Sequence, residues 1–351
     1  MKDGVLKSFL YKINIIPFIS KTLQLRKDKE KYVNSSDYFY LKSNHPFPQT
    51  VTVLRKSSVK DFKLTGNTIE AKTYDCIDNN NIKADIRADI VYREMECRYK
   101  KTIENGVESS NSKKSNYVWI CWFQGEKNAP DLVKACINSI RQNLPDKDIV
   151  VLSEKNISEY VIFPDYIVKK RQEGKISSAH YSDLLRAFLL CEYGGLWVDA
   201  TVLCTEFNAC RFFEKQSLFV YQKMDLTRHD KDSIIASSWL IYSQSNQRIL
   251  LLTKKLLCEY WRGADELNNY FLFHIFFAIS SRRYEEDLLA IPFYNNHSPH
   301  TLQFELTNHF SEVRWDEIRG FSWFHKLNHH NDYQDYPESF YQKIIEMYYP
   351  K

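Results

Sequence analysis

Features that mark membrane-spanning, disulfide-rich and nucleic-acid-binding proteins are scarce in this sequence. It has no run of about 18 or more apolar residues and no cleavable signal peptide, so we expect no membrane span. The eight cysteines form no Cys-x-x-Cys pair and no dense regular spacing, which excludes a disulfide scaffold and favours free thiols in a reducing compartment. The net charge is only +4 and no cluster of Lys and Arg resembles a recognition motif, so no nucleic-acid partner is expected.

What remains is the composition of an ordinary globular protein. Apolar residues make up 44% and charged residues 26% of the 351, a length that suggests about two domains. Four parts differ in texture: a basic amphipathic segment at 1–30, an accessory region and linker at 31–115, a main domain at 116–330 and a helical tail at 331–351. In the first part apolar residues alternate with Lys and Arg around Pro17, which fits a membrane-interface helix and a helix docked on the main domain equally well.

The accessory region mixes short β-prone runs with polar stretches. Residues 50–54 and 86–92 are rich in residues that favour strands, and residues 104–115 have the composition of a loop or linker. Either a small accessory element or a segment that wraps the main domain is compatible with this pattern.

From residue 117 onwards, predicted strands and helices alternate. We expect a buried strand at 118–123, an amphipathic helix at 131–142, a second strand at 149–152 and a helix at 178–193. This alternation predicts an α/β fold with a mainly parallel sheet flanked by helices. Beyond residue 202 the chain is aromatic and more helical, which predicts helical additions on the C-terminal side.

The stretch from residue 178 to residue 201 carries the chemistry. Asp183 and Arg186 lie three apart on one face of the predicted helix, and Gly194-Gly195 ends that helix because glycine enters the left-handed conformation without steric cost. A short apolar strand follows, and Asp199 stands at its carboxyl end, where open α/β sheets place their ligand crevices. The pattern alone fits a ligand site and fits a surface ion pair with a strand-end cap equally well.

Several motifs in a fixed order resemble those of a known family, the bacterial capsular polysaccharide synthesis proteins. They run from about residue 116 to residue 330 and comprise Val118-Trp-Ile-Cys-Trp-Phe-Gln-Gly125, Gly174-Lys-Ile-Ser-Ser178, Ser182-Asp-Leu-Leu-Arg186, Gly194-Gly-Leu-Trp-Val-Asp-Ala-Thr-Val202 and Trp323-Phe-His-Lys-Leu327. The central motifs are also similar to the Asp-x-x-Arg and Gly-Gly-x-x-x-Asp-x-Asp signature of GT-A glycosyltransferases, including the large clostridial-type toxins. The resemblance implies a GT-A type, Rossmann-like catalytic domain at 116–330.

Function follows from the resemblance as an expectation. It implies a cytoplasmic enzyme, with peripheral contact at the inner face of the cytoplasmic membrane as part of the expectation. This enzyme would move a sugar from a nucleoside-diphosphate sugar to a growing capsular or other surface polysaccharide, and UDP is the expected nucleotide. The acceptor would be a glycan or lipid-linked glycan, and the anomeric configuration would be retained. Two alternatives stay open: a toxin-like transferase that modifies proteins, and a non-catalytic scaffold that binds nucleotide sugars or glycans.

Residue roles also come from the resemblance. Asp199 and Arg186 are implied as catalytic, and donor binding is implied for six residues: Trp122, Gln124, Gly125, Asp183, Arg186 and Lys326. The leaving diphosphate gains negative charge, which a divalent cation or a group of Lys and Arg neutralises. The expected cofactor is Mn²⁺ or Mg²⁺ on Asp199, His325 and Thr201, where Thr201 replaces the second aspartate of the wider class with a neutral hydroxyl.

Other polar and aromatic residues of the C-terminal half have weaker signals. His274 stands among aromatic residues and is expected to be a core histidine. Asp225 and Asp230 fit an acceptor-side role and a charged loop equally well. Most rings beyond residue 239 are expected in the core, and any ring left exposed offers a face on which a sugar can stack.

Overall fold

A computed structural model describes residues 38–42, 51–55, 59–65, 68–74, 79–223, 232–333 and 335–350. The chain divides into two units, residues 1–87 and 88–351. In the first unit, β1 (Tyr38–Lys42) pairs antiparallel with β2 (Val51–Arg55), and β3 (Val59–Thr65) pairs antiparallel with β4 (Thr68–Tyr74). The strand expected at 50–54 corresponds to β2. The basic segment at 1–30, Asp225 and Asp230 lie outside the described residues.

The β-prone run at 86–92 is not a strand, and that expectation is wrong. These residues belong to α3 (Asn79–Arg98), which is followed by α4 (Lys100–Asn105). Ala88, Val91, Tyr92 and Met95 are buried and lie three or four residues apart, so one helical face packs into the core. This burial outweighs the local preference of the isoleucines and valine for strands.

The second unit is built on a mixed five-stranded sheet with the order β6-β5-β7-β10-β9. β5 (Tyr117–Cys121) pairs in parallel with β6 (Asp148–Leu152) and with β7 (Gly195–Val198). β10 (Ala236–Ser243) pairs antiparallel with both β7 and β9 (Leu218–Gln222), so β10 alone runs against the other strands of this sheet. The predicted α/β fold with a mainly parallel sheet is confirmed.

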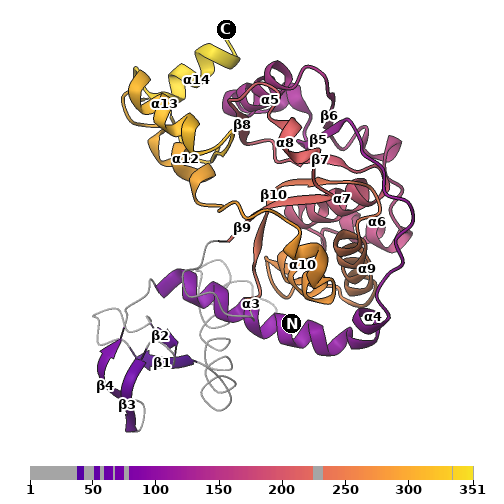
Figure 1. Ribbon diagram of the computed structural model, residues 1–351, viewed down its shortest axis with the longest axis vertical. Helices are drawn as coiled ribbons and strands as arrows, with labels where there is room; N and C mark the ends of the chain where they lie inside the picture. Colours follow the sequence, from indigo (N-terminus) through magenta and orange to yellow (C-terminus); the bar gives the residue numbers. More distant parts are fainter. Residues whose placement is uncertain are drawn as a thin grey trace, which may run out of the picture. The chain divides into compact units, whose positions relative to one another are not determined.

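Helices cover both faces of this sheet (Figure 1). On one face lie α6 (Asp165–Gln172), α7 (Ser178–Glu192), α9 (Arg248–Gly263), α10 (Leu272–Arg283) and the short α11 (Glu285–Leu289). On the other face lie α5 (Asp131–Asn143) and α8 (Cys210–Phe213). Alternate residues of β5 feed the two cores: Trp119 packs with α7, α9 and α10, whereas Val118 and Ile120 pack with α5.

The chain after the sheet adds the predicted helical elements. β8 (Val202–Cys204) pairs antiparallel with β11 (Phe324–Lys326), although more than a hundred residues separate them. Between and after them lie α12 (Thr301–Glu305), α13 (Glu312–Phe321) and α14 (Phe340–Tyr348), and α14 packs on α5. Single 3-10 turns occupy Glu126–Asn128, Ile157–Glu159 and Ser298–His300. None of the described helices is long and apolar enough to cross a bilayer.

Candidate functional site

A pocket of about 430 Å³ opens at the carboxyl ends of β5 and β7. Its walls come from the loop after β5, from the first half of α7, from the segment after β7, from β11 and from α10. This edge of an α/β sheet is the usual place for ligand crevices, because the loops that leave parallel strands meet there. Seven of the predicted site residues line it: Trp122, Gln124, Asp183, Arg186, Asp199, Thr201 and Lys326.

Two glycines bring the end of α7 directly into β7. Gly194 has φ +70° and Gly195 has φ +97°, values that residues other than glycine rarely adopt. A Cβ at Gly194 would lie 2.7 Å from the Ser245 nitrogen, and a Cβ at Gly195 would overlap the Tyr117 carbonyl oxygen of β5. The Gly194 carbonyl accepts a hydrogen bond of 2.9 Å from Trp119 Nε1. Glycine is therefore required here for β7 to lie against β5 and to end at the pocket.

Arg186 is buried at the centre of the site. Its guanidinium lies 5.0 Å from the Trp197 ring centre and 5.6 Å from that of Phe273. Arg186 Nη1 donates to the Ser238 carbonyl at 2.9 Å and lies 3.4 Å from Asp183 Oδ1, one helical turn away. Only 6% of the side chain is exposed, so packing fixes the direction of its charge toward the pocket.

Asp199 is the anion around which the positive charges gather. Its Oδ1 accepts from Trp197 Nε1 at 3.0 Å and lies 3.5 Å from Arg186 Nη2. Its Oδ2 accepts from Lys326 Nζ at 3.0 Å. Burial by itself raises the pKa of Asp199, but the charges of Lys326 and Arg186 and the hydrogen bonds outweigh burial and hold this pKa below its ordinary value. Asp199 is therefore ionised at neutral pH.

Asp183 has the opposite electrostatic behaviour. Burial raises its pKa to about 7; the nearby Arg186 opposes this rise and Asp199 adds to it. The ring nitrogen His180 Nδ1 lies 3.5 Å from Asp183 Oδ2, and burial lowers the pKa of His180 to about 4, so this ring is neutral at physiological pH. Near pH 7 the Asp183 carboxyl is present in both its neutral and its ionised form.

Lys326 reaches the pocket through the β8–β11 pair. Its register partner in β8 is Val202, and the Leu327 amide donates to the Thr201 carbonyl at 2.9 Å. From this position Lys326 Nζ donates to Thr201 Oγ1 at 2.7 Å as well as to Asp199. The strand pairing thus places an ammonium group between the two oxygens of the Asp-Ala-Thr motif.

His325, predicted to bind the cation, is not in this pocket. Side chains alternate along a strand, so His325 points away from the face that carries Lys326. It is fully buried, its Nε2 lies 3.1 Å from Thr205 Oγ1, and burial lowers its pKa to about 3. His329 and His330 line the pocket instead, with the His329 ring centre 5.2 Å from that of Trp122. The sequence signal that could have found them is the His-His pair at 329–330, which follows the last motif after one residue.

The remaining predicted residues divide between the wall and its support. Gly125 does not line the pocket; with φ +83° it closes a turn in which its amide donates to the Trp122 carbonyl at 2.8 Å. His274, expected in the core, reaches the pocket wall from α10, and burial lowers its pKa to about 3. Ser182, which begins the Ser182–Arg186 motif but was assigned no role, and the exposed Tyr270 also line the pocket.

Some residues of this pocket carry buried polar atoms without hydrogen-bond partners. Among the described residues they include Trp122 Nε1, Arg186 Nε and His274 Nδ1, and each of these residues lines the cavity. Buried polar groups in folded proteins are nearly always paired, so unpaired atoms on residues that line a cavity are compatible with a polar ligand there. The pocket itself supplies aromatic, cationic and acidic groups for it.

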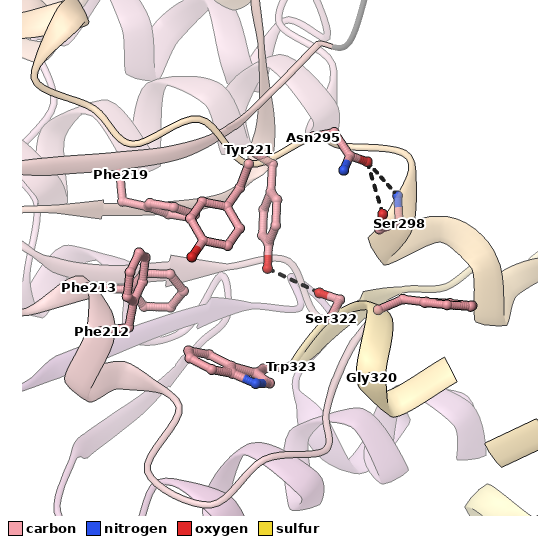
Figure 2. Close-up of a pocket in the computed structure, with 11 residues that line it drawn as sticks. Phe212, Phe213, Phe219, Tyr221, Asn295, Ser298, Gly320, Ser322 and Trp323 are labelled. Carbon is pink, nitrogen blue, oxygen red and sulfur yellow. Dashed lines mark hydrogen bonds between the residues drawn. The ribbon is translucent and has the colours of Figure 1, made fainter. Parts of the chain in front are cut away.

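A second hollow of about 220 Å³ is lined mainly by aromatic rings (Figure 2). Tyr221 and Ser322 meet across it in a hydroxyl pair of 3.1 Å, and Asn295 Oδ1 accepts from the Ser298 amide at 2.9 Å. The Trp323 ring forms one wall and is 41% exposed. Trp323 directly precedes β11, so about 10 Å of extended chain separate it from Lys326.

The residues present do not fit the expected divalent cation. Within the part of the chain that the structure describes, no three His, Cys, Asp or Glu side chains are grouped so that they could hold a metal ion. Asp199 and Thr201 remain from the expected set, and Lys326 Nζ lies between them. Mg²⁺ is commonly held by one or two carboxylates together with substrate phosphates and waters, so the number of protein ligands does not decide the fit. What opposes a cation here is the Lys326 ammonium, which already contacts both oxygens.

Comparison with known proteins identifies related chains. A family model described as capsular polysaccharide synthesis protein matches residues 72–344. The O-glycosyltransferase braB of Annulohypoxylon truncatum is 36% identical over 92 residues, which are 24% of this chain and 22% of that protein, so the chain spans about a fifth of the curated relative's length. The solved structure of the PaToxG glycosyltransferase aligns over 59% of this chain and 80% of its own, with 16% identity and a TM-score of 0.32.

Proposed function

Because the chain belongs to the capsular polysaccharide synthesis protein family, we propose that it is a glycosyltransferase that elongates a surface glycan. In this proposal the pocket at the end of β7 binds a nucleoside-diphosphate sugar, with UDP as the expected nucleotide. The sugar is transferred to a capsular or other surface polysaccharide, presented as a glycan or lipid-linked glycan. Peripheral contact with the membrane is part of the same expectation.

The observation that carries the proposal is the convergence of two cations on one carboxylate inside the pocket. Arg186 and Lys326 both contact Asp199, and burial raises the pKa of Asp183 to about 7, so Asp183 carries less than a full negative charge near neutral pH. The positive charge therefore exceeds the negative charge where an anion would bind. A diphosphate leaving group gains negative charge as the sugar departs, and preorganised cations in a sheltered site stabilise that charge most effectively.

Donor recognition divides among the remaining groups. Trp122 is half-buried with an unpaired Nε1 and offers a ring face for a nucleobase. Asp183 and Arg186 lie one turn apart on α7 and are suited to the ribose hydroxyls and to the phosphates, respectively. Gln124, which is exposed at the rim, supplies an amide for the sugar or the base.

We propose that the anomeric configuration is retained, as the resemblance implies. Both oxygens of this carboxylate are engaged by cations or by an indole N–H, which makes it a weak nucleophile toward a sugar carbon. We therefore propose front-face transfer, in which the departing phosphate accepts the proton of the acceptor hydroxyl. A product with inverted anomeric configuration, measured by NMR, would rule this course out.

The aromatic hollow supports a glycan as acceptor. Its exposed rings offer flat apolar faces to sugars, and the Tyr221–Ser322 pair and Asn295 offer hydrogen bonds beside them. Trp323 and Lys326 lie about 10 Å apart along the extended chain, so β11 links the aromatic hollow to the donor pocket. Replacing Trp323 by Ala is expected to weaken glycan binding and to leave hydrolysis of the donor unchanged.

The decisive experiment incubates the purified protein with a panel of nucleotide sugars and follows release of free nucleoside diphosphate. We expect one donor to be hydrolysed slowly, and faster with a glycan acceptor, and we expect Asp199→Ala to abolish both. Asp316→Asn, at an exposed carboxylate paired with Arg319, is the matched control. Donor binding without turnover on any acceptor would identify a non-catalytic scaffold. Transfer of sugar only to proteins would identify a toxin-like transferase. Absence of donor binding would refute the proposal.

A further inference from the structure

Lys326 Nζ occupies the position that a divalent cation would take on the Asp-Ala-Thr motif. It lies 3.0 Å from Asp199 Oδ2 and 2.7 Å from Thr201 Oγ1, the two oxygens that the motif directs into the pocket. A cation bound by both oxygens would have to lie in the same small volume as this ammonium. The two positive charges would repel each other strongly at such a separation, because the site is sheltered from water.

Strand pairing fixes where the Lys326 side chain starts, next to the Asp-Ala-Thr motif. Lys326 is paired with Val202 in the β8–β11 ladder, one residue beyond Thr201, and the adjacent Leu327 amide binds the Thr201 carbonyl. Only 22% of the Lys326 side chain is exposed. The strand that carries the ammonium and the segment that carries Asp199 and Thr201 are therefore parts of one hydrogen-bonded unit.

The charges match an ammonium better than a divalent ion. One carboxylate and one neutral hydroxyl balance a single positive charge, whereas the two aspartates of the wider signature suit a double charge. The other Asp199 oxygen is already engaged by Trp197 and approached by Arg186, which adds a second positive charge. Thr201 in place of an aspartate is thus consistent with a resident lysine as the counter-charge of Asp199.

We propose that the Lys326 ammonium replaces the divalent cation of the donor site, so that sugar transfer by this protein needs no metal ion. This inference rests on the proposed glycosyltransferase function. Two of the three N–H donors of Lys326 bind Asp199 and Thr201, and the third is available for an oxygen of the diphosphate. Lys326 is then a catalytic residue, because it contacts the leaving group.

The transfer step is balanced without a metal. The bond between the anomeric carbon and the phosphate oxygen breaks, and its electron pair stays on that oxygen. The acceptor hydroxyl oxygen forms the new bond to the anomeric carbon, and its proton passes to the departing phosphate. Lys326 and Arg186 keep their protons and stabilise the added negative charge by hydrogen bonds and by their own positive charge.

Two measurements on the unaltered protein test the inference. Titration of Mn²⁺ alone, followed by the loss of the free Mn²⁺ signal in electron paramagnetic resonance, is expected to show no saturable site up to about 1 mM. Release of nucleoside diphosphate is expected to proceed at the same rate in EDTA as in Mn²⁺ or Mg²⁺. Saturable Mn²⁺ binding, or activity that disappears in EDTA and returns with Mn²⁺, would overturn the inference. The Mn²⁺ titration needs no turnover, so it tests the inference even when the proposed function fails.

Variants identify the group responsible. Lys326→Met keeps the aliphatic stem and is expected to lower donor turnover about 10²- to 10³-fold, with an unchanged melting curve. Adding Thr201→Asp to this variant restores a two-aspartate motif without the ammonium, and it is expected to create Mn²⁺ binding and Mn²⁺-dependent turnover. Lys343→Met, at a lysine on α14 that does not line the pocket, controls for the loss of a positive charge. Turnover by Lys326→Met at the wild-type rate would contradict the role of this lysine.

Discussion

Three histidines that the fold encloses make its stability sensitive to acid. Burial lowers the pKa of His180 to about 4 and lowers that of His274 and of His325 to about 3, from an ordinary value of 6.5. The charge of Arg186 also disfavours protonation of His180 and His274. In the folded protein these rings therefore stay neutral at pH values where the unfolded chain takes up protons.

The sign and the size of the effect follow from proton linkage. Each depressed histidine contributes stability that is complete above about pH 6.5 and is lost as the pH falls toward its folded pKa, at about 1.4 kcal/mol per pH unit. Asp183 acts in the opposite sense, because its pKa is raised to about 7 and the folded state keeps a proton that the unfolded state loses. Of these four groups three oppose one, so together they should lower the free energy of unfolding by about 2 kcal/mol between pH 6 and pH 5. Burial also lowers the pKa of His300 and of His329, which act in the same sense as the three histidines.

Urea unfolding followed by tryptophan fluorescence at several pH values measures this slope. His325→Gln is expected to reduce it by about 1.4 kcal/mol per pH unit, because it removes one proton-binding difference. His297→Gln, at an exposed ring, controls for the substitution itself. A free energy of unfolding that stays constant or rises between pH 6 and pH 5, or a slope that His325→Gln leaves unchanged, would refute the burial of neutral histidines.

Three further substitutions test other parts of the structure. Gly195→Ala should destabilise the protein by about 3 kcal/mol in a thermal melt, because the new Cβ meets the β5 backbone at a residue with positive φ. Gly263→Ala, which has open space around the new Cβ, is the control. Equal melting temperatures for the two variants would contradict the β5–β7 register. Arg186→Lys should lower donor turnover about 100-fold because a lysine loses the stacked, forked geometry, and wild-type kinetics would exclude that role. Trp323→Ala should raise the KM for a glycan acceptor while donor hydrolysis is unchanged, and an equal effect on both would remove the acceptor assignment.

Local patterns predicted the elements around β7 well, because their causes are local. The helix expected at 178–193 is α7, which begins after the cap at Ser177 and ends before the glycine pair. Asp183 and Arg186 share a face because helical spacing alone puts them there. The end of the apolar strand at Asp199 follows from its length and composition.

The errors arose where distant parts of the chain decide the outcome. The run at 86–92 favours strands locally, but Val91 and Met95 find a core only as one face of a helix. The direction of His325 depends on how β11 pairs with β8, and no local signal fixes that register across more than a hundred residues. The same pairing places Lys326 beside Asp199. The two residues belong to separate sequence motifs, and the motifs themselves do not show that the residues are close together.

The charge of the pocket follows from the fold rather than from the net charge of the chain. The carboxyl groups of Asp183 and Asp199 both approach the Arg186 guanidinium, but their pKa values move in opposite directions. Burial raises the pKa of Asp183, whereas the nearby ammonium of Lys326 helps to lower the pKa of Asp199. Asp199 therefore carries the lasting negative charge, and both cations remain close to it. Below pH 7 the pocket holds more positive than negative charge, which suits a diphosphate. Because β8 and β11 supply this charge by strand pairing, any change that separates these two strands also removes the leaving-group cation from the donor site.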